Sequence, residues 1–358
     1  MSSDTLSNLL RAIRLRGAIF YHVEGVAPWV AEAPPGAEII PAILPGVEHL
    51  MEFHVVARGP CWAGILGEDP IRLDSGDLVI FPQGDAHVVS SSPGLRAERA
   101  DLGLYYAPRP PQLPYALRVA ERGAAEGAPG RDELAATIVC GFIGCDARPF
   151  NPLLAALPRM LVVHGQVDGG RPWLAGVLQA VVEESNDKRP GGEAVLERMT
   201  EMMFVEALRR YVDALPAGET GWLAGLGDAA VGRALALLHE RPAEPWTLER
   251  LGEAAAVSRS TLHERFVHLL GQPPMQYLAQ WRMQLAARWL RDTDAKVLEV
   301  ALEVGYENEA AFARAFRRAT GESPSAWRRA RRARPGRREG GGAPTPSASL
   351  ARPPRTTA

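Results

Sequence analysis

Hydrophobic positions follow a short alternating pattern in the first part of the chain. From Gly17 to about Tyr106, short apolar runs alternate with turns rich in Pro, Gly and Asp. The runs cover residues 18–23, 53–56, 61–66, 78–81 and 87–89, and residues 137–142 are a candidate closing strand. Short strands at regular spacing, with turn residues between them, predict an all-β barrel or sandwich.

The period of the pattern changes after Pro152. Leucines at 153, 154, 157 and 161 fall on one helical face, and residues 173–185 and 193–215 continue as amphipathic helices. These helices lie between the β part and a second helical region. They suit a connector that forms dimer contacts, or helices that simply pack against the barrel, and both interpretations stay open here.

Residues 246–271 predict two short helices joined by a tight turn. Thr247 is a suitable cap for the first helix, and Ser258 or Ser260 for the second. The turn falls at Ala256 and Val257, and Gly271 ends the second helix. Two helices connected in this way form a helix-turn-helix.

The second helix of this unit has two distinct faces. Leu262 and Phe266 point inward, so the opposite face carries Ser260, His263 and Glu264. Side chains on such a face are the ones that reach base edges in a major groove. These three residues are therefore the base-reading candidates of the first unit.

The same pattern returns after a long predicted helix at residues 275–290. Residues 296–303 form a short amphipathic helix, Gly305 provides the turn, and Asn308 caps a helix with Phe312 and Phe316 inward. The base-reading candidates here are Glu309, Ala310 and Arg314, of which Arg314 suits a bidentate contact with guanine. The phosphate-contact candidates are Arg259, Arg317, Arg318 and Arg328.

Two such units bridged by one helix resemble the AraC/XylS family of transcription regulators. The resemblance is carried by residues 255–262, 265–266, 271–278, 281–282, 300–306, 312–316 and 321–324. It implies seven helices, two recognition helices in adjacent major-groove segments, and double-stranded DNA and RNA polymerase as partners. Glu264 departs from the basic or polar residue of many members, since it accepts from cytosine but repels phosphate.

The charge distribution agrees with a DNA-binding C-terminal half. Residues 1–221 hold 19 Lys and Arg against 28 Asp and Glu, whereas residues 222–334 hold 17 against 13. An acidic front and a basic back indicate that only the back meets a polyanion. The last residues, 333–358, are rich in Pro, Gly, Ser and Thr, and this composition predicts a disordered tail.

The sequence also indicates the cell compartment and the class of protein. No apolar run approaches the length of a membrane span, and the N-terminus lacks a signal-peptide core, so the cytoplasm is expected and no membrane partner is. Three cysteines are too few for a disulfide framework. No nucleotide-binding loop or nucleophile–base spacing is present, so we do not expect an enzyme.

The β part contains a second recognisable pattern. Residues 76–87 read G-x5-P-x-G-x2-H, which resembles the second motif of cupin barrels, where the His (here His87) is commonly a metal ligand. Glu52, followed by six residues and then Gly59, resembles the end of the first cupin motif, but the usual H-x-H pair before it is missing. Together with residues 53–56, 61–62, 140–141, 151–154 and 157–158, this resembles the cupin sensor domains of some AraC-type regulators.

The expected architecture is multidomain α+β. It comprises an N-terminal all-β cupin barrel as sensor domain (1–165), a helical connector that is a possible dimerisation element (166–220), and an all-α double helix-turn-helix domain (221–332), followed by the tail (333–358).

A divalent metal is one candidate for the barrel interior. Strand alternation places Glu52 and His54 on one face, where they converge with His87 if that face is internal. Two imidazole nitrogens and one carboxylate suit iron, zinc or nickel. The alternative is that both histidines are hydrogen-bonded barrel residues without a metal.

Two other signals are compatible with the same domain. A small ligand could enter the barrel mouth beside Trp62, Phe81 and Tyr105 or Tyr106. An oxidant could act on Cys140 and Cys145, whose two intervening glycines allow a fold-back, with Cys61 approaching across the barrel. Oxidant sensing requires exposed thiols of low pKa, whereas the alternative is that each cysteine is a small buried apolar residue.

The sequence therefore predicts a sequence-specific DNA-binding transcription regulator, homodimeric and controlled by a small-molecule or redox signal. A metal-dependent cupin enzyme fused to a DNA-binding domain is the alternative.

Overall fold

The computed structural model describes residues 4–97, 102–106, 113–120, 134–165, 173–187, 189–216 and 218–332. The predicted disordered tail, 333–358, lies outside the described residues. The strands are β1 (Arg16–Val26), β2 (Val30–Ala33), β3 (His49–Arg58), β4 (Cys61–Ile65), β5 (Ile71–Leu73), β6 (Leu78–Phe81), β7 (His87–Ser90), β8 (Tyr115–Val119), β9 (Leu134–Cys145) and β10 (Leu161–Val163).

The helices are distributed over the whole chain. They are α1 (Thr5–Ala12), α2 (Gly36–Ile43), α3 (Leu102–Tyr106), α4 (Pro152–Ala156), α5 (Trp173–Asp187), α6 (Gly192–Asp213), α7 (Trp222–Gly227), α8 (Val231–Glu240), α9 (Leu248–Ala254), α10 (Arg259–Leu270), α11 (Pro274–Asp292), α12 (Val297–Glu303), α13 (Glu309–Thr320) and α14 (Pro324–Arg332). None of these helices is long and apolar enough to cross a membrane.

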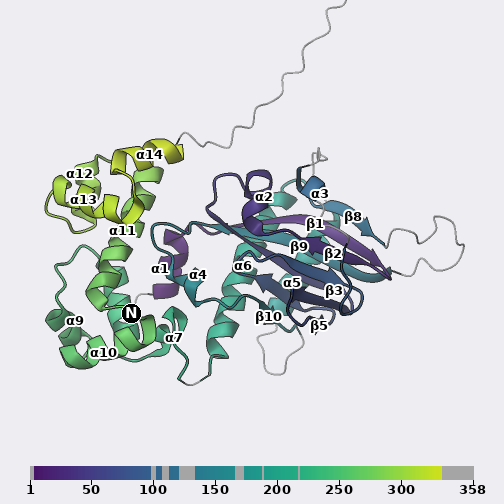
Figure 1. Ribbon diagram of the computed structural model, residues 1–358, viewed down its shortest axis with the longest axis horizontal. Helices are drawn as coiled ribbons and strands as arrows, with labels where there is room; N and C mark the ends of the chain where they lie inside the picture. Colours follow the sequence, from purple (N-terminus) through teal and green to yellow (C-terminus); the bar gives the residue numbers. More distant parts are fainter. Residues whose placement is uncertain are drawn as a thin grey trace, which may run out of the picture.

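The strands form two sheets, and Figure 1 shows both in the half of the molecule opposite α9–α14. One sheet has six strands in the order β10-β6-β3-β9-β1-β8, and the other has four in the order β2-β7-β4-β5. The pair β1–β8 is parallel and the remaining pairs are antiparallel. The predicted β architecture is confirmed, and the multidomain α+β class with it.

The six-stranded sheet is buried on both faces. On β3, Leu50 and Val56 join the core between the sheets, whereas Phe53 and Val55 join the core beneath the helices. Helix α6 packs on β1 so closely that a Cβ at Gly17 would lie 2.5 Å from Cβ of Thr200. Helices α5 and α6 therefore cover the outer face of this sheet.

The C-terminal part contains the seven helices that the resemblance implies, α8–α14. Thr247, Ser258 and Asn308 each accept a hydrogen bond from a backbone N–H of the helix that follows, so these predicted caps are confirmed. Pro274 begins α11 and Gly271 ends α10 in a left-handed conformation, with φ at 71°.

One apolar core joins the sheet to the first helix-turn-helix. This cluster runs from Phe53 on β3 through Leu9 and Ile13 beside α1 to Leu235 on α8 and Phe266 on α10. The second helix-turn-helix has a separate core around Phe312, Phe316 and Trp327. Helix α1 was not predicted from the sequence, although it is one of the links between the two halves.

Polar contacts also tie the C-terminal helices to the sheet. The carboxylate of Asp146, at the end of β9, lies 3.2 Å from Nε of Arg14 and 2.7 Å from Nη2 of Arg291. The amide of Gln284 on α11 donates to the carbonyl of Ala12 and accepts from the backbone N–H of Phe150. We refer to these six residues as the interdomain contact.

Candidate nucleic-acid interface and barrel site

The first helix-turn-helix is formed by α9 and α10. Between them, Ala256 takes a positive φ of 59°, which lets the chain reverse within three residues. Leu262 and Phe266 are fully buried beneath α10. Their burial leaves Ser260, His263 and Glu264 exposed on the other side, as the sequence predicts.

The second helix-turn-helix, α12 and α13, repeats this construction. Gly305 lies in the turn with φ at 83°, so the expected positive φ is found. A Cβ at this position would meet the carbonyl oxygen of Ala243 at 2.7 Å, so only glycine fits. Phe312 and Phe316 are fully buried, and Arg314 is exposed between them on the opposite face.

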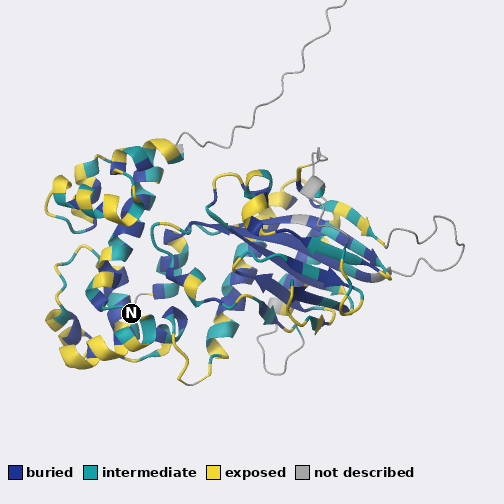
Figure 2. Cartoon of the chain, viewed as in Figure 1, coloured by how far each residue is buried: buried dark blue, intermediate teal, exposed yellow. Residues whose placement is uncertain are grey.

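The two second helices lie at the end of the molecule away from the sheets (Figure 1), and exposed positions gather on their outer sides (Figure 2). Glu309 and Ala310 at the start of α13 are exposed, as are Arg317 and Arg318 in its last turn. The barrel therefore does not cover the faces that carry the base-reading candidates.

Two of the phosphate-contact candidates have other partners. Arg328 donates to the carbonyls of Leu290 at 3.1 Å and Ala295 at 2.5 Å, so it joins α14 to the end of α11 rather than pointing into solvent. These bonds hold its side chain against the protein, and its role as a phosphate contact stays a prediction. Arg259 is exposed but donates to Glu249 at 2.9 Å, so DNA would have to compete with that carboxylate.

A cluster of buried polar side chains lies between the two sheets. Glu52 and His54 on β3 meet His87 on β7, and one ligand atom from each lies within 4.8 Å of the others. Nε2 of His54 lies 2.8 Å from Nε2 of His87, and Oε2 of Glu52 lies 3.9 Å from the same atom. The predicted convergence of Glu52, His54 and His87 is thus present in the structure.

The protons of this cluster can be assigned from its hydrogen bonds. Nδ1 of His87 must donate to the carbonyl of Asp85, 2.9 Å away, so Nε2 of His87 accepts from Nε2–H of His54. Nδ1 of His54 then accepts from the thiol of Cys140, 2.9 Å away. Cys140, His54 and His87 form one chain of neutral groups that ends on a backbone carbonyl.

Burial determines the charge of the cluster. It lowers the pKa of His87 to about 4 and the pKa of His54 well below its usual value, with the neighbouring His87 adding to the latter shift. It raises the pKa of Glu52 to about 8. All three side chains are therefore uncharged at neutral pH.

The cluster opens into a cavity of about 280 Å³. Its walls include Tyr21, Trp29 and Tyr105, so the expectation for Tyr105 is met. Trp29 was not predicted, although Gly25 gave a signal: a Cβ there would lie 2.5 Å from the indole, and a glycine within a strand often marks such a close approach.

Two aromatic residues expected at the cavity, Trp62 and Phe81, lie elsewhere, and of the alternatives Tyr105 and Tyr106 it is Tyr105 that lines it. Trp62 is not among the lining residues, because strand alternation on β4 places its neighbours Cys61 and Ala63 in the core instead. Phe81 is fully buried and stacks on the ring of His87 at 3.7 Å. Tyr106 is 55% exposed and donates to the carbonyl of Glu38.

The cysteines do not match the prediction of a reactive pair. Residues 140 and 145 belong to one extended strand, β9, so the glycines between them allow no fold-back. Cys61, Cys140 and Cys145 are all buried, and burial raises the pKa of each thiol, that of Cys61 to about 12. An oxidant sensor requires the opposite, an exposed thiolate. All three thiols are buried, as the alternative interpretation has it, but Cys140 and Cys145 also have polar partners, His54 and the amide of Asn151.

Comparisons with known proteins agree with both parts of the structure. The family model described as cupin matches residues 4–213, and the helix-turn-helix domain model matches residues 251–330. A protein of Streptomyces antibioticus described as an AraC-like transcription regulator is 34% identical, over 80% of this chain and 90% of its own length.

Two further relatives match almost end to end. The HTH-type transcriptional regulator AlkR of Acinetobacter baylyi is 29% identical over 91% of this chain and 99% of its own length. The RCS-specific HTH-type transcriptional activator RclR of Escherichia coli is 29% identical over 91% of this chain and 97% of its own length.

Proposed function

Because the chain belongs to the AraC-like transcription regulators with an N-terminal cupin domain, we propose that six side chains on α10 and α13 read its DNA site. As a member of this family it is a DNA-binding transcription regulator. The proposed base-reading residues are Ser260, His263 and Glu264 on α10 and Glu309, Ala310 and Arg314 on α13.

One observation supports this assignment above the others. Each of these side chains is exposed on a helix whose opposite face is fully buried, by Leu262 and Phe266 in α10 and by Phe312 and Phe316 in α13. The buried faces fix how each helix is rotated, so the exposed faces have one orientation toward a groove. Arg317 and Arg318 follow on α13 and are the proposed phosphate contacts.

Replacing Arg314 tests the proposal. The DNA site is first selected from a random pool with the full chain. We expect Arg314→Ala to weaken binding to that site by about fivefold to 150-fold, and to remove the preference at one base pair. Fluorescence anisotropy with the full chain and a set of single-base variants of the site measures both effects. Arg72→Ala, at an exposed arginine on β5, is the control. Equal weakening on every sequence would identify Arg314 as a phosphate contact and contradict the proposal.

We further propose that the regulatory signal is received in the barrel, where Glu52, His54 and His87 bind a divalent transition-metal ion. The donor set fits such an ion, because two imidazoles and a carboxylate are ligands for zinc, iron and nickel. Two nitrogens on a tetrahedral zinc lie about 3.3 Å apart, so the 2.8 Å between the two Nε2 atoms requires only a small opening. The ion would polarise a ligand or water bound in the cavity.

The residues of this chain prepare the site in distinct ways. The carbonyl of Asp85 holds the proton of His87 on Nδ1 and so directs the lone pair of Nε2 toward the cluster. His54 has to move its proton from Nε2 to Nδ1, toward Sγ of Cys140, before Nε2 can bind a cation. Glu52 has to lose its proton, and its raised pKa makes binding weaker below about pH 8.

Metal binding to the purified full chain tests this second proposal. Calorimetric titration with Zn²⁺ and Ni²⁺ should give one site, and His87→Ala should weaken it by about 100-fold or more. His164→Ala, at a half-exposed histidine outside the cluster, is the matched control. Absence of binding in the wild-type chain, or equal binding by His87→Ala, would exclude the metal.

Two partner assignments complete the proposal. The relative RclR is named an activator, and on that basis we propose that this chain contacts RNA polymerase when bound to its promoter. We also propose that it acts as a homodimer, which sedimentation of the full chain with and without DNA would test.

A further inference from the structure

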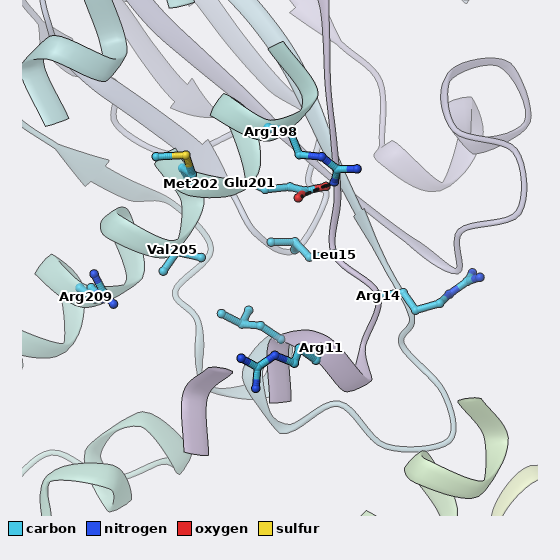
Figure 3. Close-up of a pocket in the computed structure, with 9 residues that line it drawn as sticks. Arg11, Arg14, Leu15, Arg198, Glu201, Met202, Val205 and Arg209 are labelled. Atoms are coloured by element: carbon cyan, nitrogen blue, oxygen red, sulfur yellow. Dashed lines mark hydrogen bonds and ion pairs between the residues drawn. The ribbon is translucent and has the colours of Figure 1, made fainter. Parts of the chain in front are cut away.

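A groove between α1 and α6 lies outside both the barrel and the DNA-reading helices. It has a volume of about 740 Å³ and is lined by residues of α1, of the segment between α1 and β1, and of α6 (Figure 3). Its floor is apolar and consists of Leu10, Leu15, Met202 and Val205. Met202 is 51% exposed, although the opposite side of α6 is packed against the sheet.

Arginines surround this apolar floor. Of the four that line the groove, Arg198 is paired with Glu201 at 3.0 Å, and Arg14 points away from it (Figure 3) and is paired with Asp146. Arg11 extends from α1 and Arg209 from α6, and the carboxylate of Asp4 interacts electrostatically with both. Arg11 donates to the neutral side chain of Asn8 at 3.3 Å, and Arg209 lies 3.9 Å from the carboxylate of Glu206.

We propose that this groove binds an amphipathic organic anion, with its carboxylate at Arg11 and Arg209 and its hydrocarbon chain on the apolar floor. Guanidinium groups bind carboxylates through paired, charge-assisted hydrogen bonds. The exposed side chain of Met202 and the partly buried side chains of Leu15 and Val205 lose water when a hydrocarbon chain covers them. A small inorganic anion uses only the arginines, and a neutral hydrocarbon uses only the floor, so neither uses both features. The inference does not depend on the barrel site.

The position of the groove connects it to the DNA-binding half. One wall is α1, whose Leu10 and Arg11 face the groove while its neighbours Leu9 and Ala12 are fully buried in the core shared with α8. A molecule bound against this helix contacts the element that joins the sheet to the first helix-turn-helix. Binding should therefore slow hydrogen exchange in both α1 and α8.

Calorimetric titration of the full chain with sodium octanoate tests the proposal. We expect one saturable site, with affinity rising between about twofold and fourfold for each methylene from hexanoate to decanoate. Octan-1-ol has the same chain without the charge and should bind at least tenfold more weakly. Equal affinity for octanoate and octan-1-ol, or no dependence on chain length, would overturn the proposal.

Two matched variants on α6 locate the site. Met202→Glu places a carboxylate on the floor of the groove and should weaken octanoate binding at least tenfold. Val195→Glu makes the same change at a 44% exposed residue of the same helix outside the groove and should leave binding unchanged. If Met202→Glu binds octanoate normally, the proposal is wrong. If Met202→Glu converts a dimer of the chain into a monomer, the groove is covered by a second copy of the chain, and the proposal is wrong for that reason.

Discussion

Glu52 is a carboxyl group in a buried environment that its charged form does not favour. It is 6% exposed, and its nearest polar neighbour in the cluster is Nε2 of His87 at 3.9 Å. A carboxylate in such a place loses hydration without gaining a full ion pair, which is why burial raises its pKa to about 8. The folded chain therefore keeps a proton on Glu52 that the unfolded chain releases near pH 4.5.

This difference predicts how stability changes with pH. Between pH 4.5 and pH 8 the folded state binds more protons than the unfolded state at Glu52, so the free energy of unfolding falls as pH rises. Glu52→Gln keeps the shape and removes the titration. In metal-free protein, the variant should gain stability relative to wild type by at most about 1.4 kcal/mol per pH unit over this range. Chemical unfolding at pH 5 and pH 7.5 measures the gain.

A control separates this effect from a general change in packing. Because His87 has a lowered pKa, its contribution rises between about pH 4 and pH 6.5, but it is the same in both proteins and cancels in the difference. Adding Zn²⁺ should reverse the order, since only wild type retains all three ligands. A difference that does not vary with pH would contradict the raised pKa.

Single-residue predictions from the sequence succeeded where one periodicity decided them. Alternation alone places Glu52 and His54 on one face of β3, and the structure confirms it. Alternation does not say which face of a strand points inward, and for Trp62 on β4 the choice was wrong. Nor does it give the burial of a thiol, which depends on β9 being covered on both faces.

At the scale of elements, the two helix-turn-helix units place different residue types at the position of their turn that has a positive φ. The turn of the second unit has Gly305 at a φ of 83°, and the turn of the first has Ala256 at 59°. A left-handed conformation costs an L-residue with a Cβ about 1–2 kcal/mol, and glycine avoids this cost but loses more entropy on folding. The first unit therefore carries strain that the second lacks.

Exchanging the two residue types should have opposite effects. Ala256→Gly should stabilise the protein by up to about 1 kcal/mol, because relief of strain exceeds the extra entropy. Gly305→Ala should destabilise it by about 2 kcal/mol or more, since the new Cβ meets the backbone of Ala243. Thermal unfolding measures both changes. Gly227→Ala, where no atom lies within 4 Å of the added Cβ, is the control and should change little.

Elements with strong end signals were predictable. Thr247, Ser258 and Asn308 cap their helices as expected because a cap is a local interaction, and β6 has the expected bounds. Short elements such as β5 and α2 were missed, since three strand residues or two helical turns give little periodicity. The helix α1 was missed for the same reason, although its burial shows that tertiary packing stabilises it.

For the whole molecule, the interdomain contact holds the second helix-turn-helix beside the barrel. The first unit shares the apolar core of the sheet, but the second has its own core. Its position therefore depends on α11 and on ion pairs such as Asp146–Arg291 and Glu48–Arg331, which join segments far apart in the sequence. No local sequence pattern predicts these pairs, because the two residues of each pair are far apart in the sequence and meet only in the folded chain.

Breaking the central ion pair should loosen this arrangement. Asp146 is 1% exposed and Arg291 is 9% exposed, so Asp146→Asn removes the buried one of the two carboxylates that the Arg291 guanidinium contacts, and Asp292 remains. Hydrogen exchange should become at least tenfold faster at the C-terminal end of α11 and around Asn151, while the core of β3 stays protected. Asp74→Asn, which breaks an exposed pair with Arg72, should change neither region. Unchanged exchange in Asp146→Asn would show that the Asp146–Arg291 pair does not hold the second unit.

The helix α11 has a consequence for how the protein meets a promoter. Its 19 residues span roughly 28 Å, close to one turn of B-DNA. It joins two helix-turn-helix units whose DNA-reading helices carry different side chains, Glu264 on α10 and Arg314 on α13. A single chain therefore has two distinguishable ends along the double helix. Reversing its binding site would turn the bound protein end for end relative to the start of the gene, so the orientation of the site is itself information.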